Sequence, residues 1–123
     1  RVTDNSQKFI DAAQEIGIDI STISGVQEAV LIYAGVITSL PVSDRHRLVI
    51  DIGGGSTEVI IGRQHKRLLT ESMAIGSVAW RDRFFAEPSS DEAVLAAQLD
   101  SATEASVKVF ERISPSVACL LAQ

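Results

Sequence analysis

The chain has 123 residues, of which 46% are hydrophobic and 22% are charged, and its formal net charge is −5. This composition is typical of one folded globular domain, and it excludes a disordered or fibrous chain. The acidic balance argues against non-specific nucleic-acid binding, which requires a basic surface, and the longest apolar stretch, residues 29–37, is far shorter than the ~20 residues of a membrane span.

The first part of the chain predicts a helix followed by a strand. Between residues 6 and 16, apolar side chains recur at helical spacing, and Gly17 follows at the place where helices commonly end. Residues 17–23 then alternate in the pattern of a half-buried strand. We therefore expect a helix over 6–16 and a strand over 17–23.

A second helix is expected from Gly25 to about Gly35. Ser24 and Gln27 have the spacing of a capping box, in which each side chain accepts a hydrogen bond from the backbone N–H of the other residue. Glu28 then lies in the first turns of this helix, where the helix dipole favours an acidic side chain.

The central part of the chain predicts three strands. Residues 48–52 are apolar except for Asp51, and a glycine-rich turn at 53–56 separates them from a second strand at 57–61. After a short basic turn, residues 67–73 can supply a third strand. The sequence thus predicts a strand, a glycine turn and a strand in direct succession.

The last part of the chain predicts two helices and a buried strand. Residues 77–85 have helical spacing, and Ser89 with Glu92 forms a capping box for a longer helix that ends at Pro115. The run 117–121 is a short apolar segment of the kind found inside parallel sheets. The expected order is α, β, α, β, β, β, α, α, β, which is an α/β fold.

The one cysteine, Cys119, lies in this last apolar run. Because no basic neighbour is there to activate it, we expect a buried and inert thiol. A single cysteine also excludes a disulfide framework within the chain. We therefore expect a reducing, cytoplasmic location.

The most informative segment, residues 51–58, reads D-I-G-G-G-S-T-E. Glycines can adopt backbone angles closed to other residues, and without side chains their N–H groups can converge on an anion such as phosphate. Asp51 would present a carboxylate beside the turn, where it can hold a divalent cation or a water. A tight hairpin, in which the glycines serve geometry alone and Asp51 caps the turn, is equally compatible with the spacing.

Other segments accompany residues 51–58 in a fixed order along most of the chain. They are Asn5, Phe9 and Ala13, followed by residues 23–25, 28–29, 31–36, 49–62, 72–76 and 83–85. Together they resemble the exopolyphosphatase and guanosine pentaphosphate phosphatase (Ppx/GppA) family of the actin-like ATPase superfamily. The resemblance implies a ribonuclease H-like fold of two domains flanking a cleft, with residues 1–36 ending the first domain and residues 37–123 beginning the second.

The resemblance also implies roles for individual residues. Glu28 matches a glutamate proposed to activate the attacking water, and such general-base assistance contributes about 10²–10⁴ in rate. The residues that match the phosphate site are Gly53, Gly54, Gly55 and Ser56, and those that match the Mg²⁺ site are Asp51 and Glu58. Without the resemblance, Glu28 is an ordinary first-turn acid and Glu58 an outward-facing strand residue.

The chain departs from the family pattern at several positions. Gln27 stands where a second glutamate is usual, Val30 where an arginine is usual, and Ser77 where a cysteine is common. The family's first phosphate loop would precede Arg1, and no glycine-rich loop follows the last expected strand. We therefore interpret the chain as an excised part of a longer protein, with two of the three walls of the cleft outside it.

The implied function is hydrolysis of the terminal phosphate of inorganic polyphosphate or guanosine pentaphosphate with Mg²⁺, by a protein of which this part alone is inactive. Two alternatives stay open: part of an ATPase or kinase of the same superfamily, and a non-catalytic phosphate-binding or dimerising module. We expect a homodimer, because a half-sheet leaves an apolar face and an unpaired edge.

Overall fold

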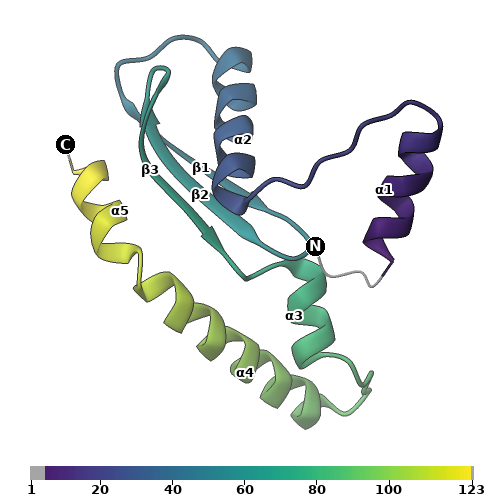
Figure 1. Ribbon diagram of the computed structural model, residues 1–123. Coiled ribbons are helices and arrows are strands. Elements are labelled where there is room, and N and C mark those ends of the chain that lie inside the picture. Colours follow the sequence, from purple (N-terminus) through teal and green to yellow (C-terminus); the bar gives the residue numbers. More distant parts are fainter. Residues whose placement is uncertain (1–4, 123) are drawn as a thin grey trace.

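The computed structural model describes residues 5–122, which form five helices and three strands (Figure 1). In chain order these elements are α1 (Ser6–Glu15), α2 (Gly25–Ser39), β1 (His46–Ile52), β2 (Thr57–Arg63), β3 (Lys66–Met73), α3 (Ser77–Phe84), α4 (Glu92–Glu111) and α5 (Ser114–Leu121). Helix α2 lies against the sheet, α4 runs from beneath α3 toward α5, and α1 lies apart from the sheet at the end of an extended segment (Figure 1).

The three strands form one antiparallel sheet in the order β1-β2-β3. Asp51 of β1 lies opposite Glu58 of β2, and Glu58 in turn lies opposite Ser72 of β3. Because β2 is the central strand and is covered on both faces, residues 57–62 are all buried. The three central strands that the sequence predicts are thus confirmed, each longer than expected by one or two residues.

Helix α2 covers one face of the sheet. Ala29, Tyr33 and Ile37 recur every four residues, so they lie on one side of the helix, and they form a buried cluster with Ile60 of β2. The Tyr33 hydroxyl donates to the carbonyl oxygen of Gln64 in the β2–β3 turn over 2.9 Å. The helix is thereby anchored to the hairpin at one end of the sheet.

On the opposite face, the part formed by β2 and β3 is covered by side chains from α4 and α5, with one side chain from α3. Val59, Met73 and Ile75 form the buried cluster there, and the residues packed against it are Trp80, Val109, Ile113 and Val117. Trp80 Nε1 also donates to Ser106 Oγ over 2.8 Å, which ties α3 to α4. The expected helix before Pro115 is confirmed as α4, although two of its apolar side chains, Leu95 and Leu99, are exposed.

The strand expected over residues 17–23 is not formed. The segment is irregular, it pairs with none of the described strands, and Ile18 is 52% exposed. Gly17 has a φ of +81°, so it ends α1 in the left-handed conformation that glycine favours. The alternation of side chains was consistent with a strand, but among residues 5–122 no neighbouring strand supplies the hydrogen bonds that a strand requires.

The strand expected over residues 117–121 is also wrong, because this run is part of α5. Pro115 lies in the first turn of that helix, where the missing N–H of proline costs nothing, so it starts a helix as well as following one. One side of α5 faces solvent, and Cys119 is exposed, contrary to the expected buried thiol. Within residues 5–122, no helix combines the length and apolar character needed to cross a bilayer.

The two expected capping boxes have different outcomes. At α2 the box is confirmed: Ser24 Oγ accepts from Gln27 N over 3.2 Å, and Gln27 Oε1 accepts from Ser24 N over 2.8 Å. At α4 the cap is Asp91, whose Oδ1 accepts from the N–H of Ala93, and Ser89 Oγ accepts only from Asp91 N. The glutamine that departs from the family pattern at position 27 therefore has a local structural role.

Candidate active site

The glycine-rich connection between β1 and β2 caps the N-terminus of helix α3. The first N–H groups of a helix have no partner within it, and the N-cap residue Gly76 has no side chain to supply one. Instead, the N–H groups of Ser77 and Val78 donate to the carbonyl oxygens of Gly53 and Gly54, respectively, each over 2.9 Å. The turn is thereby fixed against α3.

This contact orients the N–H groups of the turn. A trans peptide places the carbonyl oxygen of one residue and the N–H of the next on opposite sides, and no described peptide bond is cis. Because the carbonyls of Gly53 and Gly54 face α3, the N–H groups of Gly54 and Gly55 face away from it. Within residues 5–122, neither of these N–H groups donates a hydrogen bond to another residue. These two adjacent N–H groups can therefore donate hydrogen bonds to a bound anion.

The glycines of the turn are suited to close approach more than to unusual backbone angles. Among the described glycines only Gly17 has a positive φ, so residues 53–55 do not use the left-handed region. A Cβ on Gly53 would lie 3.2 Å from the carbonyl oxygen of Ser56, and one on Gly54 would lie 3.4 Å from Val78 Cγ2. A Cβ on Gly55 would meet no atom within 4 Å, so this residue borders open space.

Two carboxylates lie beside the turn, on the face of the sheet that α2 covers. Asp51 and Glu58 are directly opposite each other in the β1–β2 register, so their side chains share that face. Glu58 is buried, with 1% of its surface exposed, and Asp51 is half-buried. The alternative reading of Glu58 as an outward-facing residue is wrong, because a central strand covered on both faces has no outward side.

The donor set suits a magnesium ion. Mg²⁺ prefers oxygen ligands and keeps several of its own waters, so one or two carboxylates suffice to hold it. Asp51 and Glu58 supply two such groups, and the described part of the chain contains no group of three or more His, Cys, Asp or Glu residues that would form a closed metal site. The residues present therefore fit a partly hydrated Mg²⁺ better than a structural zinc ion.

Helix α2 begins over the same end of the sheet. A Cβ on its first residue, Gly25, would lie 2.8 Å from Ser72 Cβ and 3.7 Å from Glu58 Oε1. Glu28 follows in the first turn and is half-buried, next to the sheet-facing Ala29. The structure therefore brings Glu28 to the end of the sheet that carries the two carboxylates and the glycine turn.

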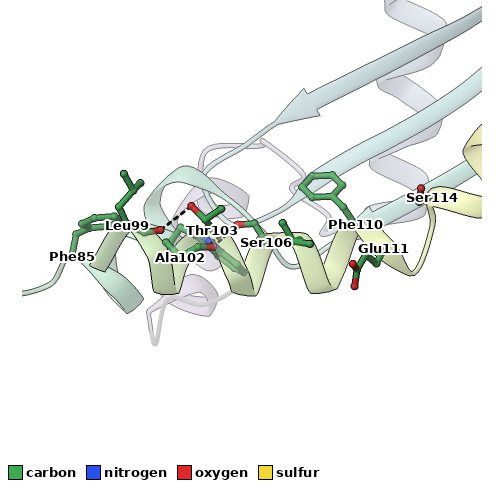
Figure 2. A pocket seen from close by; sticks show the side chains of 10 residues that line it. Phe85, Leu99, Ala102, Thr103, Ser106, Phe110, Glu111 and Ser114 are labelled. Atoms are coloured by element: carbon green, nitrogen blue, oxygen red, sulfur yellow. Dashed lines mark hydrogen bonds between the residues drawn. The ribbon is translucent and has the colours of Figure 1, made fainter. Parts of the chain in front are cut away.

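An apolar groove of about 540 Å³ runs along α4 and is separate from these residues. It is lined by Trp80 and Phe85 from the α3 region and by Leu99, Phe110 and Glu111 among the residues of α4 (Figure 2). None of the candidate site residues lines it. The groove is an apolar surface without the convergent N–H groups or paired carboxylates of the glycine turn.

The chain is similar in sequence to phosphatases of one known family. The model of the Ppx/GppA phosphatase family matches residues 1–118, so the chain belongs to this family. It is 39% identical over 114 residues to a guanosine-5'-triphosphate,3'-diphosphate pyrophosphatase of Photobacterium profundum, covering 92% of this chain and 22% of that protein.

Solved structures show the same likeness. The chain matches an exopolyphosphatase of Cytophaga hutchinsonii with a TM-score of 0.70 and 34% identity, over 91% of this chain and 36% of the other. It matches the PPX-GPPA enzyme of Aquifex aeolicus with a TM-score of 0.66 and 27% identity, over 90% and 36%. The chain thus spans about a fifth to a third of these relatives, and its mixed α/β fold with a three-stranded antiparallel sheet matches part of their structures.

Two residues with contacts in the site, Ser72 and Gly76, received no role from the sequence. Both belong to the segment 72–76, which was part of the resemblance, so its position in the motif was a signal. Their contacts depend on the β2–β3 register and on the approach of α3 to the glycine turn. Neither relationship can be deduced from spacing along the chain.

Proposed function

We propose that the protein carrying this chain is a phosphohydrolase that releases the terminal phosphate of inorganic polyphosphate or guanosine pentaphosphate. The observation that carries the proposal is the orientation of the glycine turn. Its carbonyls are held by α3, and two N–H groups without partners in the described chain face the other way. They lie at the end of the sheet that carries Asp51 and Glu58 and over which α2, with Glu28, begins. Membership of the Ppx/GppA family supports the reaction class.

Phosphoryl transfer depends mainly on positioning and charge stabilisation, and different residues of the chain have these roles. The N–H groups of Gly54 and Gly55 bind phosphoryl oxygens, in a turn completed by Gly53 and Ser56. Asp51 and Glu58 hold Mg²⁺, which when bound neutralises negative charge on the phosphate oxygens.

Glu28 is the proposed general base for the attacking water. It lies in the first turn of a helix whose start packs directly on Ser72 and Glu58. A carboxylate there can accept a proton from a water directed at a phosphate bound in the turn. The expected contribution is about 10²–10⁴ in rate.

The domain assignment forms part of the same proposal. Residues 1–36 would end one ribonuclease H-like domain, and residues 37–123 would begin a second, with the cleft between them. Because the chain spans only 22% to 36% of its relatives, we propose that the 123-residue chain alone hydrolyses phosphoanhydrides very slowly.

Steady-state hydrolysis by the complete protein, measured as phosphate release from both substrates with Mg²⁺, tests the proposal. Glu28→Gln should lower kcat at least ~100-fold with KM little changed. The matched control is Glu92→Gln, since Glu92 is also an acidic residue in the first turn of a helix, α4. Equal activity in both variants would remove Glu28 from the mechanism, and hydrolysis of ATP without hydrolysis of either substrate would favour an ATPase or kinase.

We also propose that the chain forms a homodimer, which one feature of the sheet favours. β1 is an edge strand of the described sheet, and three of its apolar side chains are exposed on the face opposite α2: Leu48, Ile50 and Ile52. An unpaired edge with an apolar face is a common site of strand pairing.

A further inference from the structure

The segment from Ser72 to Gly76, which links β3 to α3, contacts both halves of the candidate active site. We propose that Ser72 and Gly76 are positioning residues: Ser72 holds the Glu58 carboxylate, and Gly76 holds the glycine turn with its N–H groups facing the phosphate. The inference rests on the proposed function, because it assigns these two residues to the same site.

Ser72 is the hydrogen-bond partner of Glu58. The two residues lie directly opposite each other on β3 and β2, and Ser72 Oγ donates to Glu58 Oε1 over 2.8 Å. Glu58 is 1% exposed, so its carboxylate has little access to bulk water. Buried carboxylates need a donor, and this hydrogen bond also restricts the direction in which the second oxygen, Oε2, can point.

Helix α2 closes over this pair, which explains why residue 25 is a glycine. A Cβ at Gly25 would lie 2.2 Å from Ser72 Oγ and would displace it. Ser72 therefore lies between the Glu58 carboxylate and the first turn of the helix that carries Glu28. One hydroxyl links the proposed metal ligand to the element that bears the proposed base.

Gly76 holds the other half of the site by close backbone contact. A Cβ there would lie 2.3 Å from the Gly54 carbonyl oxygen and 2.5 Å from Gly55 N. These atoms belong to backbone and cannot rotate away, so any larger residue must shift the turn or α3. Gly76 is also the N-cap of α3, whose N–H groups bond the Gly53 and Gly54 carbonyls.

The two ends of the segment are held at a fixed spacing. Thr57, at the start of β2, donates through Oγ1 to the Ile75 carbonyl oxygen over 2.6 Å, and Ile75 N donates to the Met73 carbonyl over 2.8 Å. Met73 and Ile75 are both buried in the cluster with Val59. A rigid link of this kind lets one segment set the position of the glycine turn relative to Glu58.

The inference is tested in the complete protein with Ser72→Ala and Gly76→Ala. Mg²⁺ binding, measured by titration calorimetry without substrate, should weaken ~10-fold or more in Ser72→Ala, as is usual when the partner of a metal ligand is lost. Binding of tripolyphosphate should weaken in Gly76→Ala, and its kcat/KM should fall up to ~100-fold, the loss expected for a displaced site.

Matched controls remove the same groups elsewhere. Ser106→Ala deletes a partly buried hydroxyl that is hydrogen-bonded on α4, and Gly35→Ala adds a methyl group where no atom lies within 4 Å. If Gly76→Ala fails to fold, Ser77→Pro replaces it. Proline is favoured at the first position of a helix, and this substitution removes both groups of Ser77 that donate to the Gly53 carbonyl oxygen, the backbone N–H and the hydroxyl.

The outcomes separate this inference from the proposed function. Hydrolysis of either substrate by the wild type, with Ser72→Ala and Gly76→Ala both binding and turning over like their controls, would overturn the inference and leave the function standing. No hydrolysis by the wild type, with Mg²⁺ binding that still depends on Ser72 and tripolyphosphate binding that depends on Gly76, would overturn the function and support the inference. A wild type that binds neither ligand would overturn both.

Discussion

Asp51 and Glu58 lie directly opposite each other on adjacent antiparallel strands. Two acidic side chains in this relationship repel each other when both are charged, so the pair costs stability in the absence of a cation. We predict that Asp51→Asn raises the free energy of unfolding by ~0.2–1 kcal/mol without Mg²⁺ while it lowers hydrolysis. Thermal unfolding with and without Mg²⁺ checks this. If Mg²⁺ stabilised the variant as much as the wild type, Asp51 would not be a ligand.

Two glycine substitutions should have opposite effects on stability. A Cβ on Gly62 would lie 2.1 Å from the buried Tyr33 hydroxyl, whereas a Cβ on Gly35 in α2 would meet no atom within 4 Å. Gly62→Ala should therefore lower the free energy of unfolding by ~1–3 kcal/mol, typical of an overpacked core. Gly35→Ala should raise it by ~0.5–1 kcal/mol, because alanine suits a helix interior better than glycine. Urea denaturation of both variants provides the measurement, and a stable Gly62→Ala protein would contradict the packing of Tyr33 on β2.

The stability of α4 should depend on its N-cap, Asp91, more than on Ser89. Asp91 Oδ1 accepts from the N–H groups of Ala93 and Val94, so Asp91→Ala should cost ~1 kcal/mol of stability. Ser89→Ala removes only the hydrogen bond that Ser89 Oγ accepts from Asp91 N, and it should lower the free energy of unfolding by less than ~0.5 kcal/mol. Comparison of the two melting temperatures decides between them. A larger loss in Ser89→Ala would restore the capping box that the sequence predicts.

The one tyrosine in the chain, Tyr33, should ionise at a higher pH than an exposed tyrosine. Burial raises the pKa of Tyr33 above its ordinary value of 10.0, and the positive charge of Arg47 lowers it by a smaller amount. The unfolded chain therefore ionises first, so the stabilisation is complete below pH 10 and is lost as the pH rises through the folded pKa. Ultraviolet absorbance titration reports this residue alone. Ionisation at an ordinary pKa in the folded protein would show that the hydroxyl is solvated.

Self-association through β1 should be concentration-dependent. Light scattering of the 123-residue chain at low micromolar concentration should give the mass of a dimer, and Ile50→Lys should shift it to a monomer, because a charge on an edge strand opposes pairing. Lys on the exposed face of a different element, for example Val107→Lys on α4, is the control. A folded wild type that is monomeric throughout would rule out the dimer.

Much of the fold followed from local patterns, and the errors have a common physical cause. Residues 48–52 and 57–61 were predicted because an apolar run, a glycine turn and a second apolar run specify a hairpin locally. Residues 17–23 and 117–121 were assigned wrongly because alternation and apolarity report burial, whereas a strand also needs a partner. As a helix, the run at 117–121 packs Val117 against the sheet and leaves the other side exposed, so apolarity alone did not distinguish a helix from a strand.

The positions of the candidate site residues relative to one another were predictable in part. The segment 51–58 and Glu28 were identified from sequence, and the structure brings them to one end of the sheet. The burial of Glu58 was missed because it depends on β2 being central, which only the pairing of both neighbours determines. The contacts of Ser72 and Gly76 join residues far apart in sequence, so no local pattern encodes them.

Phosphate binding at the glycine turn is tested most directly by amide nuclear magnetic resonance of the isotope-labelled 123-residue chain during titration with tripolyphosphate and Mg²⁺. We predict saturable shifts of the Gly54 and Gly55 N–H signals, because these donors face away from α3, with Gly17 and Gly35 unchanged. Signals of Gly54 and Gly55 that stay fixed while residues elsewhere shift, such as those of the basic β2–β3 turn, would contradict the assignment of the phosphate site.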